Sequence, residues 1–366
     1  MTSPDRADAQ LHIDLDAIAG NYQDLARIAA PAVCAAAVKA DAYGLGAERV
    51  VPALAAAGCR QFFVAHLCEG IALRAVVPQA DIAVLHGPSP GTEPEFMAHD
   101  LIPVLNEPGQ VERWSRLAKD NGGLPAILHV DTGMNRLGLS AGEAGALADA
   151  PERLDGIALR LVMSHLAIAE EPDHPMNEQQ RGRFEALRAR LPAAPASLAN
   201  SSGIFIGPDY RYDMVRPGIA LYGGNPTPGR PHPLRDPVRL RARILQLREI
   251  DSGESVGYGA AFRASGPCRI ATVPVGYADG YLRALSNQGL AYVAGMEVPV
   301  VGRVSMDLIT IDVTAIPAGA VNVGDFVDLI GGGIALDDAA QRAGTIGYEL
   351  LTSLGQRYAR IYSPAA

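Results

Sequence analysis

Short apolar runs alternate with longer amphipathic segments between about residues 30 and 220. The runs share the length and composition of buried parallel strands, and they lie at 33–38, 62–66, 82–85, 102–105, 126–131, 158–164, 196–199 and 214–221. Helical periodicity between them is clearest at 45–57, 108–119 and 177–191. Eight parallel strands that alternate with helices are enough to close a barrel. The pattern therefore predicts an α/β protein that begins with a (β/α)8 TIM-type barrel.

The pattern changes after a Pro- and Gly-rich stretch at 223–237 (GGNPTPGRPHPLRDP), which is typical of an interdomain linker. Residues 239–244 (RLRARI) then alternate strictly between basic and apolar, as a half-buried strand does. Residues 11–15 (LHIDL) alternate too and are a candidate strand for pairing with this second domain. We predict an N-terminal segment 1–10, a barrel domain 11–228 and a mostly β C-terminal domain 229–366.

Charge and cysteine usage narrow the class of protein. The 366 residues carry 31 Lys and Arg against 40 Asp and Glu, a net charge of −9 that disfavours nucleic acid and anionic lipid as partners. No apolar run is long enough to span a membrane, and residues 1–10 lack the apolar core of a secretory signal, so we expect a cytoplasmic protein. The four cysteines are scattered, which favours free thiols and no metal site.

Polar residues directly after the predicted strands are the candidates for an active site, because barrel active sites lie at the C-terminal ends of strands. They are Lys39, residues 131–136, His165, Asn200 with Ser201, and Arg216 with Gly218. Lys39 follows the run AAAV, where burial would lower the pKa of its amine and make it nucleophilic. A lysine that reaches solvent at a strand end is the alternative.

The loops after the last two predicted strands, 200–203 (NSSG) and 216–219 (RPGI), leave backbone N–H groups accessible to an anion. Ordinary turns explain the same residues equally well. Together with Lys39, these loops suggest pyridoxal 5′-phosphate (PLP), since that cofactor needs an imine-forming lysine and a phosphate cradle in one cavity. The sequence contains no P-loop and no complete GxGxxG motif, so it does not support a nucleotide-binding fold.

Residues 37–46 (AVKADAYGLG) resemble the cofactor-lysine motif of the alanine racemase family. Further blocks agree with that family in the same order, at 130–138 (VDTGMNRLG), 164–167 (SHLA), 198–203 (LANSSG), 213–223 (DMVRPGIALYG), 256–281 (VGYG through VGYADGY) and 301–307 (VGRVSMD). The resemblance spans nearly the whole chain, and the last two blocks are its most specific part.

The resemblance implies a role for each residue of the cavity. Lys39 would bind PLP covalently, and His165 and Asn200 would lie beside the pyridine ring. The phosphate would be held by Tyr43, Ser201, Gly218, Ile219 and Tyr348. Arg216 would face the ring nitrogen, where a group that does not release its proton keeps the ring a weak electron sink. The alternatives are a satisfied polar histidine and a structural ion pair for the arginine.

Racemisation needs acid/base groups on both faces of the α-carbon. Lys39 would serve one face, and the resemblance assigns the other to Tyr258 of the partner subunit of a homodimer with shared active sites. Arg136 and the backbone N–H of Met306, again across subunits, would bind the substrate carboxylate. The alternative for Tyr258 is an ordinary interface tyrosine.

One position departs from the family. Many members have a lysine, commonly carbamylated, where this chain has His129, and a neutral imidazole does not supply the negative charge that orients Arg136. Either an anion such as chloride takes that place, or Arg136 is held differently.

The predicted function is a PLP-dependent racemase that interconverts L- and D-alanine and supplies D-alanine for peptidoglycan. A racemase of broader or serine specificity and a non-catalytic PLP-binding protein remain alternatives. The second domain and Tyr258 argue against the non-catalytic class, and Arg216 argues against a decarboxylase, whose ring nitrogen needs an acidic partner.

Overall fold

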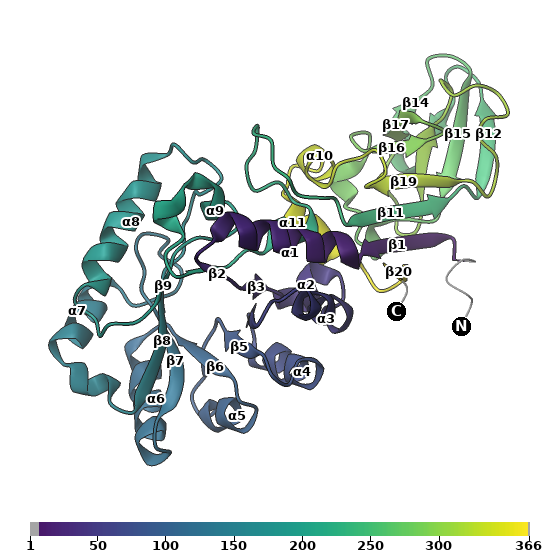
Figure 1. Ribbon diagram of the computed structural model, residues 1–366. Helices are drawn as coiled ribbons and strands as arrows, with labels where there is room; N and C mark the ends of the chain where they lie inside the picture. Colours follow the sequence, from purple (N-terminus) through teal and green to yellow (C-terminus); the bar gives the residue numbers. More distant parts are fainter. Residues whose placement is uncertain (1–6, 365–366) are drawn as a thin grey trace.

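The computed structural model describes residues 7–364, so the first six residues of the predicted N-terminal segment lie outside the described residues. Figure 1 shows two bodies joined by helix α1 (Leu15–Ala29): an α/β body that extends to about residue 222, and a β body that contains residues 9–14 and the C-terminal part of the described chain. Among residues 7–364, no helix has the length and apolar character needed to cross a bilayer.

Seven parallel strands form the main sheet of the first body. In spatial order they are β3 (Ala36–Ala37), β4 (Gln61–Val64), β5 (Asp81–Val84), β6 (Ile102–Leu105), β7 (Leu124–His129), β8 (Ile157–Met163) and β9 (Ala196–Ser197). Strand β2 (Val33–Cys34) leads into β3 and pairs in parallel with β10 (Met214–Val215). The Arg216 N–H donates to the Ala199 carbonyl at 3.0 Å, so β10 continues beside β9. The ring of strands confirms the predicted TIM-type barrel.

The eighth predicted strand was too long. It ends at Val215, and the apolar residues that follow form the fully buried 3-10 turn η4 (Ile219–Tyr222). Pro217 has no N–H for a strand ladder, which ends the strand there. The chain then turns across the barrel end instead of extending along it.

Helices cover the outside of the barrel (Figure 1). They are α3 (Ala47–Ala56), α4 (Leu67–Val76), α5 (Glu93–Ala98), α6 (Pro108–Asp120), α7 (Ala141–Asp149), α8 (Pro175–Arg188) and the short α9 (Gly203–Ile206). The three helices predicted most clearly from periodicity correspond to α3, α6 and α8, with ends shifted by a few residues. Each buries one apolar face against the strands, as amphipathic helices do.

A nine-stranded sheet forms the β body, in the order β12-β15-β18-β17-β16-β19-β11-β1-β20. Its strands are β1 (Ala9–Asp14), β11 (Val238–Arg243), β12 (Gln246–Ile250), β15 (Cys268–Val273), β16 (Leu290–Val293), β17 (Met296–Val301), β18 (Ile309–Asp312), β19 (Phe326–Ile330) and β20 (Ala359–Ser363). The body also contains the small hairpin β13 (Ser255–Val256) with β14 (Phe262–Arg263), and the helices α10 (Leu336–Arg342) and α11 (Gly347–Ser353), which the sequence pattern did not indicate. The prediction of a mostly β C-terminal domain is confirmed.

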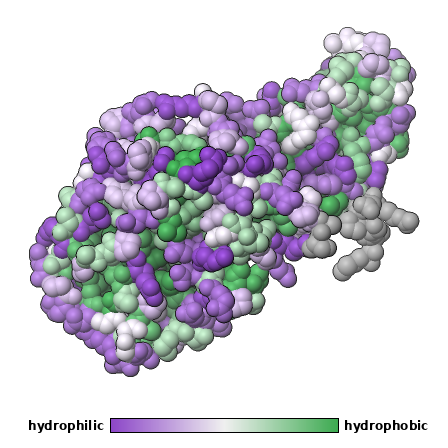
Figure 2. Space-filling model, in the orientation of Figure 1, coloured by the Kyte–Doolittle hydropathy of each residue, from purple (hydrophilic) through white to green (hydrophobic). Residues whose placement is uncertain are grey.

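Strand β1 pairs antiparallel with β11 and parallel with β20. The candidate strand at 11–15 therefore belongs to the sheet of the β body, except that Leu15 already begins α1. Buried side chains from both bodies, among them Leu11, Leu25 and Leu240, form one continuous core. The surface is mostly hydrophilic, with apolar atoms exposed on both bodies (Figure 2).

Candidate active site

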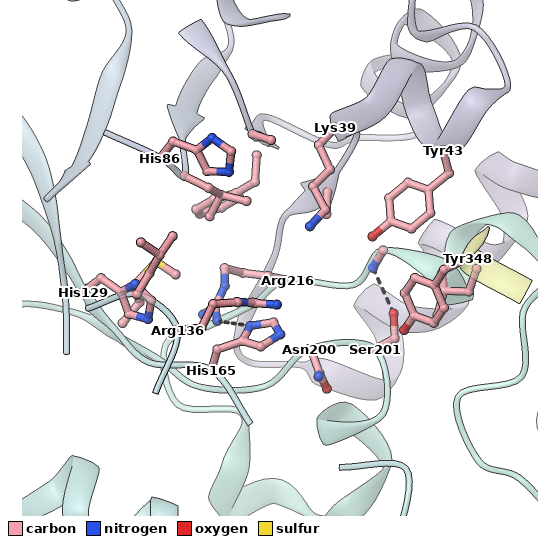
Figure 3. A pocket seen from close by; sticks show the side chains of 18 residues that line it. Lys39, Tyr43, His86, His129, Arg136, His165, Asn200, Ser201, Arg216 and Tyr348 are labelled. Atoms are coloured by element: carbon pink, nitrogen blue, oxygen red, sulfur yellow. Dashed lines mark hydrogen bonds between the residues drawn. The ribbon is translucent and has the colours of Figure 1, made fainter. Parts of the chain in front are cut away.

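A cavity of about 550 Å³ opens at the C-terminal ends of the barrel strands. Ten residues singled out from the sequence line it together, as Figure 3 shows for most of them: Lys39, Tyr43, Arg136, His165, Asn200, Ser201, Arg216, Gly218, Ile219 and Tyr348. They come from segments scattered over some 300 residues of the chain, and the barrel topology brings their strand ends to one face.

Lys39 lies two residues after the end of β3, and its amine points into the cavity (Figure 3). Burial lowers the pKa of the Lys39 amine, and the nearby Arg136 guanidinium lowers it further, against a smaller opposing effect of Glu69. A larger fraction of the amine is then unprotonated at neutral pH. This is the state in which a lysine attacks an aldehyde carbon.

The chain after Lys39 makes a left-handed turn. Ala40, Asp41, Ala42 and Tyr43 all have φ between 53° and 58°, a conformation that costs roughly 1–2 kcal/mol for each L-residue. The Ala42 N–H donates to the Val38 carbonyl at 2.9 Å, and the Ala40 N–H donates to Glu69 Oε1 at 2.6 Å. The turn places Lys39 and Tyr43 on the same side of the cavity, where Figure 3 shows them side by side.

Tyr43, Ser201 and Gly218 form a compact cradle opposite the histidines. A Cβ at Gly218 would lie 2.1 Å from Tyr43 Oη, so only glycine permits this approach. Ser201 Oγ accepts the Gly218 N–H at 2.9 Å and the Ala220 N–H at 3.3 Å. The Tyr43 and Tyr348 rings lie 5.9 Å apart and close the cradle on its outer side. Hydroxyl groups and backbone N–H groups converge here, which suits a phosphate.

Arg216 is buried at 6% exposure and is held by neutral acceptors. Its guanidinium donates to the Ser164 carbonyl at 2.5 Å and to Ser197 Oγ, and it lies 3.5 Å from His165 Nδ1. It forms no ion pair within residues 7–364. Burial lowers the pKa of Arg216 to about 10, which leaves it cationic at neutral pH. The same burial, with the charge of Arg216, lowers the pKa of His165 well below its ordinary value and keeps that imidazole neutral.

The cavity is strongly cationic. Lys39, Arg136 and Arg216 line it, whereas none of its lining residues is an aspartate or glutamate. A buried cation without a carboxylate partner is costly, so the buried Arg216 and the partly buried Lys39 favour an anionic ligand, and the exposed Arg136 adds positive charge to the same cavity. A phosphorylated cofactor and a substrate carboxylate would supply the missing negative charge, and the cradle beside a nucleophilic lysine fits PLP.

His129 lines the same cavity, and its hydrogen bonds determine which ring nitrogen carries the hydrogen. Asn106 Nδ2 donates to the carbonyls of Leu85 and Val104, both at 2.9 Å, so Asn106 Oδ1 faces His129 Nδ1 at 2.7 Å as an acceptor. His129 Nδ1 must then carry the hydrogen. Burial, with the charges of Arg216 and Arg136, lowers the pKa of His129 to about 4. The ring is therefore neutral at physiological pH, and its Nε2 is an acceptor.

Two residues of the site were missed in the sequence, His86 and Asn106. His86 lines the cavity, and its ring packs edge-on against His66 at 4.5 Å between centroids. Both residues directly follow predicted strands, 82–85 and 102–105. The strand-end rule that selected Lys39 and His165 would have found them as well.

Tyr258 and Met306 do not line the cavity of their own chain. Both lie in the β body and are exposed, Tyr258 by 73% and Met306 by 54%. Side chains this exposed on a folded domain are free to reach another molecule.

Comparison with known proteins points to one family over the whole chain. The family model "Alanine racemase, N-terminal domain" matches residues 13–226, and "Alanine racemase, C-terminal domain" matches residues 237–362. A relative from Rhodospirillum rubrum named alanine racemase is 52% identical over 99% of this chain and 98% of its own length. One from Mesorhizobium japonicum named catabolic alanine racemase is 52% identical over 97% of this chain and 93% of its own.

A solved structure gives the same result. The alanine racemase of Bartonella henselae, crystallised with covalently bound pyridoxal phosphate, superposes with a TM-score of 0.94 at 44% identity, covering 97% of this chain and 99% of that one.

Proposed function

The chain belongs to the alanine racemase family, and from that premise we propose that it interconverts L- and D-alanine by two-base proton transfer in the barrel cavity. Its cofactor is PLP. The observation that carries the proposal is the position of Lys39, whose amine has a lowered pKa and points into a cavity lined by Arg136 and Arg216 and by no carboxylate.

Different residues of the cavity would bind different parts of the cofactor. Lys39 would hold it covalently, and Tyr43, Ser201, Gly218, Ile219 and Tyr348 would hold its phosphate. His165 and Asn200 would lie against the ring. When bound, PLP takes up the electron pair left on the α-carbon after its proton departs.

Arg216 would face the ring nitrogen. Since Arg216 remains a hydrogen-bond donor at neutral pH, it would leave that nitrogen unprotonated. Arg216 would in this way favour return of the proton to the α-carbon, which is racemisation, over its transfer to the cofactor, which is transamination.

Two bases would flank the α-carbon. Once substrate has displaced it, the Lys39 amine removes or returns a proton on one face, and Tyr258 of the partner subunit does so on the other. Arg136 and the Met306 N–H of the partner subunit would grip the substrate carboxylate. Positioned acid/base groups contribute about 10²- to 10⁴-fold in rate.

The proposal also covers the oligomeric state, the compartment and the use of the product. The enzyme would act as a cytoplasmic homodimer with shared active sites, and its D-alanine would serve peptidoglycan. The exposure of Tyr258 and Met306 supports a second copy, and four free cysteines suit a reducing compartment. The net charge of −9 supports a small-molecule partner rather than nucleic acid.

The proposal is tested by proton NMR of L-alanine in D₂O with purified protein and added PLP, followed by chiral analysis. We expect the α-proton signal to disappear as D-alanine forms, and Lys39→Ala to lower the rate by at least about 10²-fold. Exchange with retained L configuration would contradict two-base transfer. Absence of exchange with alanine but exchange with serine would identify a different substrate, and absence with both would identify a non-catalytic PLP-binding protein.

A further inference from the structure

The left-handed turn at residues 40–43 carries the cofactor lysine at its start and Tyr43 at its end. Because left-handed L-residues are unfavourable, such a turn persists only where surrounding contacts determine it. Within the barrel, Glu69 and Val38 bind its first N–H groups. Asp41 binds its exit, since its backbone carbonyl accepts the Gly46 N–H at 2.9 Å.

The other contacts at the exit come from the β body. Strand β20 lies at the edge of the nine-stranded sheet and reaches the barrel beside α2 (Lys39–Gly44) and α3. Its Arg360 Nη1 donates to the Gly44 carbonyl at 2.6 Å, and its Tyr362 Oη donates to the Leu45 carbonyl at 2.9 Å. Arg49 of α3 lies over the Tyr362 ring at 4.9 Å and fixes its orientation.

Steric contacts make this docking specific. A Cβ at Gly46 would lie 2.2 Å from Tyr362 Oη, and a Cβ at Gly44 would lie 2.6 Å from the Leu351 carbonyl oxygen of α11. The backbone that leaves the turn, at Gly44 and Gly46, is thus in direct contact with two elements of the β body. A shift of β20 would be transmitted to the turn through these contacts.

We propose that Arg360 and Tyr362 are positioning residues, through which the β body holds the turn in its left-handed conformation and so sets the place of the Lys39 amine and the Tyr43 hydroxyl. The proposal rests on the proposed function, since it takes Lys39 as the cofactor lysine. Neither residue lines the cavity. Their effect passes through the backbone of residues 40–45.

The test compares Tyr362→Phe and Arg360→Met holoenzymes with wild type, and Arg360→Lys as the conservative variant. Tyr292→Phe, on β16 of the same sheet, is the matched control. The readouts are the rate of PLP release, followed by the absorbance of the lysine-bound cofactor, together with kcat, KM and Tm. We expect PLP release about tenfold faster and kcat about tenfold lower in the first two variants, since small misplacements of reacting groups cost this much or more.

Recovery in Arg360→Lys, with Tm values no lower than that of Tyr292→Phe, would support positioning. The positioning role would be overturned if Tyr362→Phe and Arg360→Met both released PLP at a rate, and had a kcat, within twofold of wild type. It would also be overturned if the control Tyr292→Phe changed by the same amount. If one variant does not fold, the other and Arg360→Lys decide. A wild-type protein that binds PLP without racemising alanine would defeat the proposed function, while the PLP release rates would still decide the positioning role.

Discussion

At the scale of residues, the cavity combines two arginine cations with imidazoles that stay neutral. Arg136 and Arg216 supply the positive charge, whereas burial and the same arginines lower the pKa values of His129 and His165. The histidines therefore add acceptors without adding charge. This division suits a site that must bind two anionic groups, a phosphate and a carboxylate, in one place.

Bicarbonate is expected to have no effect on activity. A lysine at position 129 would take up carbon dioxide as a carbamate, whereas the neutral imidazole of His129 is held by Asn106 at 2.7 Å and offers no amine. We expect kcat/KM of wild type to be unchanged when bicarbonate is added to degassed buffer. His129→Lys is the control and should respond. A bicarbonate-dependent rate in wild type would contradict the prediction.

The lowered pKa of His129 also predicts acid sensitivity of the fold. Between the ordinary pKa of 6.5 and the folded-state pKa of about 4, the unfolded chain binds a proton at His129 that the folded chain does not. The free energy of unfolding therefore rises with pH in this window and falls as pH drops through it. From pH 7 to pH 5, we expect His129 to lower the free energy of unfolding by about 2 kcal/mol. Urea unfolding of wild type and His129→Gln at both pH values measures this, and equal losses in the two proteins would contradict it.

At the scale of elements, the site depends on how strands end. Five polar side chains lie one or two residues after the end of a strand, so the parallel strands hold them at one face of the barrel: Lys39, His86, Asn106, His165 and Arg216. The least regular element, the left-handed turn after β3, directly follows Lys39. Strain at a functional site of this kind is maintained by the packing around it.

Gly46→Ala is expected to destabilise the protein more than an ordinary glycine replacement. Gly46 has φ +92° and its new Cβ would meet Tyr362 Oη at 2.2 Å, whereas Gly122 has φ +74° and no atom within 4 Å of such a Cβ. Gly122→Ala therefore carries the backbone cost alone, about 1 kcal/mol. We expect Gly46→Ala to cost about 1–3 kcal/mol more in denaturant unfolding. Equal losses of unfolding free energy in the two variants would contradict this prediction, because they would show that β20 moves aside from the new Cβ without a measurable cost.

At the scale of the whole molecule, the residues of the proposed reaction lie on different bodies. Lys39 and Arg136 line the barrel cavity, while Tyr258 and Met306 are exposed on the β body of the same chain. In a two-fold dimer whose interface joins the β body of one copy to the barrel of the other, that contact would form twice and would serve both cavities.

Mixed dimers test this arrangement. Lys39→Ala and Tyr258→Ala homodimers should both be inactive, since each lacks one base at both sites. A mixed dimer has one site without either base and one with both, so random exchange of subunits should restore roughly a quarter of wild-type activity. The readout is D-alanine formation after the two variants are denatured and refolded together. Failure to recover activity, with dimers present, would place both bases on one chain.

Much of this molecule was accessible from its sequence. Periodicity and strand number led to the barrel and the β domain, and the strand-end rule led to Lys39, His165, Asn200, Ser201 and Arg216. The early end of the eighth strand was missed because an apolar run looks alike in a strand and in a buried 3-10 turn. Helices α10 and α11 are short, seven residues each, and do not repeat long enough to show a helical period.

The element pattern, the domain order and the types of reactive side chain could be predicted without the structure, because they follow from local periodicity and from residues at strand ends. The protonation of His129, the left-handed turn and its contacts with Arg360 and Tyr362 depend instead on how the chain folds. Those properties arise between residues as much as 317 positions apart. Burial, tautomer choice and backbone strain depend on what surrounds a residue in space, and a linear sequence does not state those neighbours.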